Sequence, residues 1–225
     1  MTIKVISFDL DGTIVDFNYN KAFWDEAIPH LYSKRHKISL EEAKKIVFDD
    51  YKKLKQPDDA RWYTPSFWFQ RFDIGSFEDV AKDLAHHVRL YHDVIPSLKT
   101  LSRKFKLVVI SNSLKEFVEL KLEAEGIGRY FSKYYSVLDM FGGFKSPVVY
   151  KAILKDLGVG AKAVIHVGDD AEFDYFAARK AGLHAFLLNR GDGPEFLDTN
   201  ATNRKVPPGN IIRNLNDLKK RVENL

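Results

Sequence analysis

Four short runs of β-forming apolar residues constrain this chain more than any other feature. They occupy 3–10, 106–113, 163–170 and 184–190 of the 225 residues. Each run is nearly continuous rather than alternating, which is typical of strands covered on both faces. Helical patterns separate the later runs, so strand and helix repeat along the chain. We therefore expect an α/β core with a mainly parallel sheet.

The segment 17–93 breaks this rhythm. It is rich in helix formers and aromatic residues and contains no convincing buried strand. Ser39, with Glu42 three residues later, forms a capping-box pattern that predicts the start of one helix. We therefore expect 1–16 and 94–225 to form the α/β core domain, with 17–93 inserted as a helical domain.

Within the insertion, 56–72 has the sequence of an irregular connector that carries several aromatic residues. Two interpretations of these rings are open: they line a substrate pocket, or they form the core of a small helical unit. The second is favoured because large aromatic residues are usually buried. Arg61 and Arg71 can either meet an anionic group of a substrate or lie on the surface, and surface placement is favoured. The aromatic residues are Trp62, Tyr63, Phe67, Trp68, Phe69 and Phe72.

Composition excludes several classes of site. The chain has no cysteine, so disulfides, thiolate metal sites and thiol nucleophiles are ruled out. The formal net charge of +4 comes from basic residues spread along the sequence, which does not predict nucleic-acid binding. No apolar stretch approaches the ~18 residues of a membrane span, and the first β-run begins too early for a cleaved leader. We expect a cytoplasmic protein without membrane contact, either a monomer or a homodimer.

Polar residues gather where the predicted strands end. The segments are "DLDGT" at 9–13, "SNS" at 111–113, "GFKSP" at 143–147 and "GDDAEFD" at 168–174. Ligands bind at the carboxyl ends of strands in open parallel α/β sheets. These segments therefore predict one shared site.

In this order and at roughly this spacing, the four segments resemble the haloacid dehalogenase-like hydrolase superfamily, and the resemblance covers essentially the whole chain. It implies a Rossmann-like three-layer core with an all-α cap domain, the cap being 17–93. It also implies Mg²⁺-dependent phosphoryl transfer from a small phosphorylated substrate through an aspartyl-phosphate.

Under this resemblance the first segment supplies the reacting carboxylates. Asp9 is the expected nucleophile, and Asp11 would protonate the leaving oxygen and then activate water. Gly12 permits a tight backbone turn, and the hydroxyl of Thr13 would steady the loop near the phosphate. The competing interpretation of this segment is a plain helix cap or turn.

The second and third segments supply the expected phosphate-binding groups. The hydroxyl of Ser111 and the amides that follow, at Asn112, would hold phosphate oxygens. Lys145 would neutralise the transferring group as an electrostatic clamp. The alternative for Lys145 is an ordinary surface lysine.

The carboxylates together predict a metal. Two carboxylates about 4 Å apart repel by roughly 4 kcal/mol at an effective dielectric constant near 20, and a divalent cation relieves that repulsion. Mg²⁺ takes one or two carboxylates besides water and substrate oxygens. Asp9, the backbone carbonyl of Asp11, and Asp169 are the expected ligands.

The supporting acid in the fourth segment is ambiguous, because both Asp170 and Asp174 fit. We favour Asp174, because it is expected to stand at the start of the next helix and because similar proteins have an aspartate at this position. A helix N-cap is its competing role, and the two roles can coexist. Phe173 stands where many relatives have Asn.

Three alternatives to a phosphatase stay open. In dehalogenases of the superfamily the second acid of the first segment is typically replaced, so the presence of Asp11 favours phosphatase chemistry. Phosphomutases share the same catalytic set. A non-catalytic binding protein could keep the fold, although the intact set of polar residues argues against it.

Overall fold

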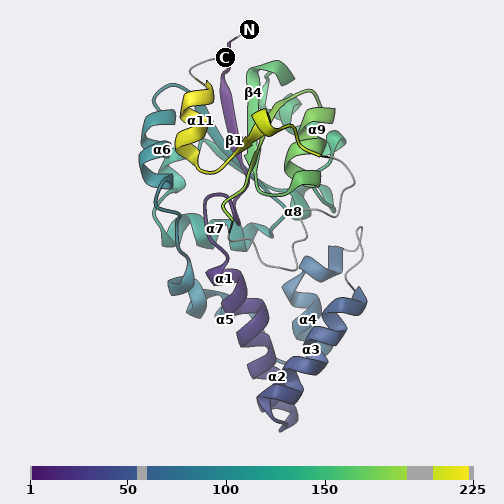
Figure 1. Cartoon of the computed structure of the whole chain (residues 1–225). Helices are drawn as coiled ribbons and strands as arrows, with labels where there is room; N and C mark the ends of the chain where they lie inside the picture. The colour runs from purple at the N-terminus through teal and green to yellow at the C-terminus, as the bar shows by residue number, and fades with distance from the viewer. Residues whose placement is uncertain (1, 55–59, 192–204, 223–225) are drawn as a thin grey trace.

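The computed structural model describes residues 2–54, 60–191 and 205–222 (Figure 1). At its centre lies a six-stranded sheet, parallel throughout, in the order β3-β2-β1-β4-β5-β6. The strands are β1 Val5–Phe8, β2 Lys106–Ser111, β3 Lys133–Ser136, β4 Val164–Gly168, β5 His184–Leu188 and β6 Ile211–Ile212. The four predicted β-runs all contain a strand, and the expected α/β fold class is confirmed.

Two strands were not predicted. β3 contains one lysine and two tyrosines, and β6 has only two residues, so neither strand forms a long apolar run. β3 lies at one edge of the sheet and β6 at the other. Edge strands are often short and carry charged residues, which discourages pairing with another chain.

The register of the sheet explains why polar residues of different strands meet. Phe8, the last residue of β1, pairs with Val109 in β2 and with Val167 in β4. The amide of Asp9 continues this ladder by donating to the carbonyl of Val167 at 2.8 Å. The residues that follow β1, β2 and β4 therefore emerge at the same edge.

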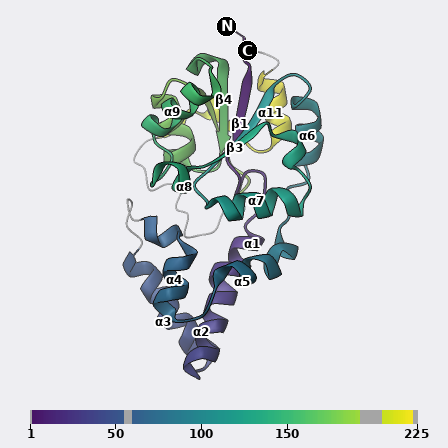
Figure 2. The same ribbon diagram turned by 180° about the vertical axis from the view of Figure 1, so that it is seen from behind.

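Helices cover both faces of the sheet (Figures 1 and 2). On one face α6 and α11 pack together, and on the other α9 packs with α10. Alternate residues of the strands point into the two layers: Ile6 and Phe8 join the first, whereas Val5 joins the second. The α-helices of the core are α6 Val94–Leu101, α7 Lys115–Ala124, α8 Val137–Phe141, α9 Pro147–Leu157, α10 Ala177–Lys180 and α11 Leu215–Val222; the other helical segments are η4 Gly128–Tyr130, η5 Ala161–Ala163, η6 Ala171–Phe176 and η7 Pro208–Asn210.

The segment after β1 extends away from the sheet as a helical lobe (Figure 2). Within 17–54 and 60–93 the structure contains no strand, apart from a single bridge between Val15 and Leu90. The expected all-α character is confirmed. Its elements are α1 Asn18–Asn20, η1 Lys21–Ala27, α2 Ile28–His36, α3 Leu40–Leu54, η2 Ala60–Tyr63, α4 Pro65–Phe72, α5 Phe77–Asp83 and η3 Leu84–His87.

The predicted start of α3 is confirmed, but the irregular connector is partly wrong. The hydroxyl of Ser39 accepts a hydrogen bond from the amide of Glu42 at 3.2 Å. Residues 55–59 lie outside the described part of the chain, and the rest of the predicted connector is helical apart from Thr64, the N-cap of α4. Pro65 begins α4, because its missing N–H costs nothing in the first turn of a helix.

The aromatic residues of α4 form a core, as the favoured interpretation predicted. Trp68, Phe69 and Phe72 are buried, and the Trp68 and Phe72 rings stack 5.4 Å apart. This core is continuous with the layer beneath the sheet, since the rings of Phe23 and Phe117 lie 5.1 Å apart. The lobe is therefore joined to α7 by ring packing.

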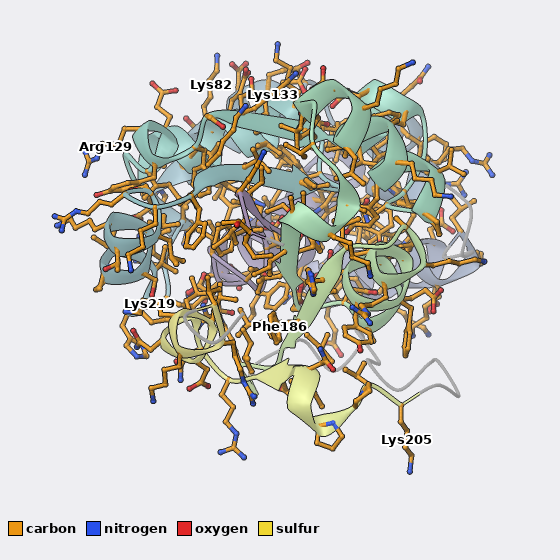
Figure 3. All side chains as sticks on the ribbon, turned by 90° about the horizontal axis from the view of Figure 1, so that it is seen from above. Lys82, Arg129, Lys133, Phe186, Lys205 and Lys219 are labelled. Atoms are coloured by element: carbon orange, nitrogen blue, oxygen red, sulfur yellow. The ribbon has the colours of Figure 1, made fainter. Side chains whose placement is uncertain are left out.

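The C-terminal helix completes the first layer. Leu215 and Leu218 of α11 lie three residues apart on one face of the helix and are both buried; residues 223–225 lie outside the described part. Figure 3 shows Phe186 on the sheet side of α11, in the same core cluster as Leu215 and Leu218, whereas Lys219 lies on the outer side of the helix. No described helix is both long and apolar enough to cross a membrane.

Candidate active site

The tight turn after β1 places Asp9 inside the molecule, with 6% of its surface exposed. Gly12 has a φ of +73°, which favours glycine. A Cβ atom at this position would also lie 2.3 Å from a carboxylate oxygen of Asp169. Glycine is thus required both by the turn and by the close approach of the fourth segment.

Lys145 joins the first and fourth segments. Its Nζ donates to Asp9 Oδ1 at 2.6 Å and to Asp174 Oδ1 at 2.5 Å, and only 3% of its side chain is exposed. Its backbone amide donates to Asn112 Oδ1 at 2.8 Å. The surface-lysine alternative is wrong.

Asp174 is the most completely bonded carboxylate of the site. Besides Lys145, its Oδ1 lies 3.0 Å from His166 Nε2, and its Oδ2 accepts from the amide of Asp170 at 3.0 Å. A Cβ atom at Gly168 would lie 2.2 Å from Asp174 Cγ, so a glycine there admits this carboxylate. Asp174 therefore links Lys145, His166 and the turn after β4 through hydrogen bonds.

The predicted position of Asp174 at the start of the helix is corrected by the structure. Asp170 is the N-cap of η6, with its Oδ1 accepting from the amide of Phe173 at 2.7 Å. Asp174 lies one turn further on and is fully buried. Sequence alone could not separate the two, because both aspartates stand near the start of one helix.

Burial and neighbouring charges set the ionisation of the cluster. Burial raises the pKa of Asp9 to about 7 against the opposing charge of Lys145. Burial acts on Asp174 in the same direction, but Lys145 and His166 outweigh it and hold its pKa at about 2. Burial lowers the pKa of His166, whose Nε2 lies 3.0 Å from Asp174 Oδ1 and whose Nδ1 lies 2.8 Å from Ser7 Oγ.

The cluster fits a hard divalent cation. Carboxylate oxygens of Asp9, Asp169 and Asp174 lie within 4.8 Å of one another. Burial and the adjacent charges of Asp9 and Asp174 raise the pKa of Asp169 well above its usual range. Oxygen donors with excess negative charge suit Mg²⁺. The side chain of Asp11 is not part of this group.

Asp11 instead belongs to a second cluster, which the sequence analysis missed. Its Oδ1 accepts from Lys121 Nζ at 2.5 Å, and its Oδ2 accepts from Ser113 Oγ at 3.0 Å. Lys121 also donates to Asn20 Oδ1, in the first helix of the lobe, at 2.7 Å. The two carboxylates of the first segment thus have separate lysine partners.

Two other predicted site residues, Ser111 and Thr13, differ in their contacts. Ser111 ends β2, is buried, and accepts from the amide of Ser113 at 3.1 Å. The hydroxyl of Thr13 is buried and makes no hydrogen bond within the described residues, and its expected role near the phosphate stays a prediction. Arg190 holds the backbone of this residue, donating from Nη2 to the carbonyl of Thr13 at 2.7 Å and pairing with Asp93 at 3.0 Å.

One ring of the aromatic stretch reaches the site. Tyr63 packs against Phe144 at 5.0 Å between ring centroids, and Phe144 against Phe173 at 5.5 Å. Burial and the charges of Asp170 and Asp169 raise the pKa of the Tyr63 phenol to about 12. The expected surface position of Arg71 is confirmed, where it pairs with Asp50 at 2.6 Å.

The sequence contains an indication for each of the two functional residues that were missed, Lys121 and His166. Lys121 stands on the helix face that also carries Phe117 and Val118, where a charge requires a buried partner. His166 interrupts the otherwise apolar run of β4. A polar residue at a position that should be buried is the observation that would have identified both.

The family model described as "haloacid dehalogenase-like hydrolase" matches residues 3–182, well over half of the chain. The chain belongs to this family. The predicted family resemblance is confirmed.

Several members of the haloacid dehalogenase-like hydrolases show how far the likeness extends. The chain is 31% identical over 158 residues to haloacid dehalogenase-like hydrolase domain-containing protein 3 of Danio rerio, covering 67% of this chain and 62% of that protein. It is 28% identical over 203 residues to the phosphoglycolate phosphatase of Vibrio parahaemolyticus, covering 84% and 85%. The crystal structure of a HAD phosphatase from Thermococcus onnurineus superposes with a TM-score of 0.81 at 26% identity, covering 98% of each chain.

Dehalogenases of the family share the architecture too. The 2-haloacid dehalogenase of Pseudomonas syringae superposes with a TM-score of 0.68 at 23% identity over 99% of each chain. That likeness shows the fold alone. The chemistry of this haloacid dehalogenase-like hydrolase must be argued from its site.

Proposed function

We propose that the protein is a Mg²⁺-dependent phosphatase that hydrolyses a small phosphorylated metabolite through an aspartyl-phosphate on Asp9. One observation carries the proposal: the two carboxylates of the first segment are held differently. Lys145 bonds one oxygen of Asp9, and the other has no hydrogen bond within the described residues. Both oxygens of Asp11 are held by side chains. This is the arrangement expected of a nucleophile beside a fixed proton-transfer group.

In the first step the free oxygen of Asp9 attacks phosphorus, and the bond from phosphorus to the leaving oxygen breaks. Asp11 gives its proton to that oxygen, so an alcohol departs. Lys145 sits 2.6 Å from Asp9 and neutralises charge on the transferring group. The amides after Ser111 bind the phosphoryl oxygens.

In the second step Asp11, now a carboxylate, takes a proton from water as the water oxygen attacks phosphorus. The bond from phosphorus to Asp9 breaks, and inorganic phosphate leaves with both catalytic aspartates restored. Atoms and protons balance over the two steps. The same residue serves first as acid and then as base.

Asp9, Asp169 and the backbone carbonyl of Asp11 would hold the cation, with Asp174 supporting them. Mg²⁺ bound there supplies positive charge that offsets the phosphate and the carboxylates. Because the bonds of Asp174 run to Lys145, His166 and Asp170, its own contribution is to fix the cluster. We assign Asp170 to capping η6.

The helical lobe, 17–93, is proposed as the cap over a core formed by 1–16 and 94–225. Tyr63 supports this assignment, since its ring packs against Phe144, the neighbour of Lys145. A cap in this position excludes water and selects the substrate. The cytoplasmic location and the monomeric or dimeric state stay predictions from the sequence.

A direct test measures phosphate release from 4-nitrophenyl phosphate and from a panel that includes 2-phosphoglycolate, with Mg²⁺ and with EDTA. We expect turnover with Mg²⁺ and at least a hundredfold loss with EDTA, reversed by added Mg²⁺. Undiminished activity in EDTA would contradict the metal assignment. No phosphate release from any substrate, with the fold intact by circular dichroism, would support the binding-protein alternative.

The enzymatic alternatives give different products. A dehalogenase would release chloride from 2-chloropropionate in an Asp9-dependent reaction, and we expect none above background. A phosphomutase would convert a sugar phosphate into its positional isomer, which ³¹P nuclear magnetic resonance distinguishes from free phosphate. We expect free phosphate as the product.

A further inference from the structure

A second buried lysine stands beside the proposed site and has no role in the reaction described above. Lys121 lies in the middle of α7, and 1% of its side chain is exposed. Its neighbours on the buried face are Phe117, Val118 and Leu122. An ammonium group removed from water costs several kcal/mol unless it is paired, so its partners must explain its presence.

The charged partner of Lys121 is Asp11. Lys121 Nζ donates to Asp11 Oδ1 at 2.5 Å and to Asn20 Oδ1 at 2.7 Å. It also lies 4.9 Å from the centroid of the Tyr19 ring. Of these contacts only Asp11 carries an opposite charge, and among the described residues Lys121 is the only cation within ion-pair distance of Asp11.

Lys121 and Ser113 bond opposite oxygens of the same carboxylate. Ser113 Oγ donates to Asp11 Oδ2 at 3.0 Å, from the loop after β2. Two donors fixed in different elements define the plane of the Asp11 carboxylate, which a single bond would leave free to rotate. Proton transfer depends strongly on that orientation.

We propose that Lys121 is a positioning residue for Asp11: it holds the proton-transfer carboxylate in the orientation that reaches the leaving oxygen. The inference rests on the proposed function. Among the described residues the hydrogen bonds of Lys121 run to Asp11 and Asn20 and not to Asp9 or Lys145, so it would act on the reaction through Asp11. Through Asn20 it also ties that orientation to the first helix of the lobe.

The test compares two substrates that differ only in their need for a proton. 4-Nitrophenyl phosphate has an activated leaving group, and phenyl phosphate does not. For Lys121→Met, we expect kcat on phenyl phosphate to fall roughly 10- to 100-fold, kcat on 4-nitrophenyl phosphate to fall only a few-fold, and KM to stay nearly constant. Lys121→Arg should recover part of the loss.

Two further variants complete the design. Lys115→Met removes an exposed lysine from the same helix and should behave as wild type on both substrates. The double variant Lys121→Met with Asp11→Asn should be no slower than Asp11→Asn alone, because both changes remove the same function. A multiplicative loss would contradict positioning through Asp11.

Folding of the variants is checked by thermal melts, since Lys121→Met leaves Asp11 without its cation. If that variant does not fold, Ser113→Ala provides the same comparison and should show a several-fold loss confined to phenyl phosphate. Equal losses on both substrates, or wild-type rates on phenyl phosphate, would overturn the inference. An inactive wild type would instead reject the proposed phosphatase function.

Discussion

The sheet-bearing core and the helical lobe bury different kinds of side chain. Among the described residues of the lobe, 17–93, the buried side chains are apolar and largely aromatic, and the buried charged residue there is Asp93, at the boundary with the core. The core, 1–16 and 94–225, buries two lysines, two aspartates and a histidine close to its strands. Those residues are Asp9, Lys121, Lys145, His166 and Asp174.

The comparison shows what each part is built to do. Buried ion pairs contribute little to stability, because desolvation offsets their attraction, and apolar residues of similar volume are often as good. The ring packing of the lobe has no such cost and simply holds its helices together. We infer that charge is buried in the core for chemistry, whereas the lobe shapes the space above it.

The largest effect on activity is expected in the core, from Asp9→Asn. It keeps the shape of the side chain but removes the attacking oxygen, so turnover should fall roughly 10⁴-fold or more. No phosphoenzyme should be trapped after acid quenching with labelled substrate. A covalent phosphoenzyme formed by this variant would contradict the nucleophile assignment.

A smaller loss is expected from Asp11→Asn, which leaves attack possible but removes proton transfer. The reduction should be roughly 10²- to 10⁴-fold with an unactivated leaving group. With 4-nitrophenyl phosphate the variant should still show a burst of nitrophenol, followed by slow turnover. Stopped-flow absorbance measures both phases, and absence of the burst would mean that Asp11 acts before or during attack.

In the lobe the largest effect should be on stability rather than on chemistry. Trp68 is fully buried, and its Nε1 donates to the carbonyl of Trp62 at 3.0 Å. Trp68→Ala should lower the free energy of unfolding by about 3–5 kcal/mol, measured by urea denaturation. Trp68→Phe is the matched control and should cost less. Equal losses in the two variants would show that the hydrogen bond, not ring packing, holds the lobe.

The smallest effect is expected at the surface of the lobe. Burial would raise the pKa of Asp50, but hydrogen bonds from Arg71 and Lys53 outweigh it and lower the pKa below its usual value. Asp50→Asn should therefore cost about 0.2–1 kcal/mol at pH 7. Because the pKa is lowered by folding, this contribution is lost as pH falls below about 4. Urea melts of both proteins at pH 7 and pH 3 should diverge at the higher pH only.

Sequence patterns located the strands that carry the site but not the edges of the sheet. The runs at β1, β2, β4 and β5 are long and apolar because these strands are buried on both faces. β3 was missed because its lysine and two tyrosines do not form an apolar run; among the described strands it lies at the edge of the sheet, beside β2. In α4 the predicted irregular structure was wrong because Pro65 starts the helix and ring burial overrides weak local preference.

The sequence by itself determined the family, the parallel α/β core and the identity of Asp9, Asp11, Lys145 and Asp169 as the groups to examine, because their chemistry follows from residue type and from their place after strands. Only the tertiary structure decided how they are paired. Lys145 joins Asp9 to Asp174, and Lys121 joins Asp11 to Asn20, across as many as 136 positions of the chain. Such pairs depend on the register of neighbouring strands and on which helix face is buried. Neither is encoded within a single segment, because each arises only when distant segments pack together.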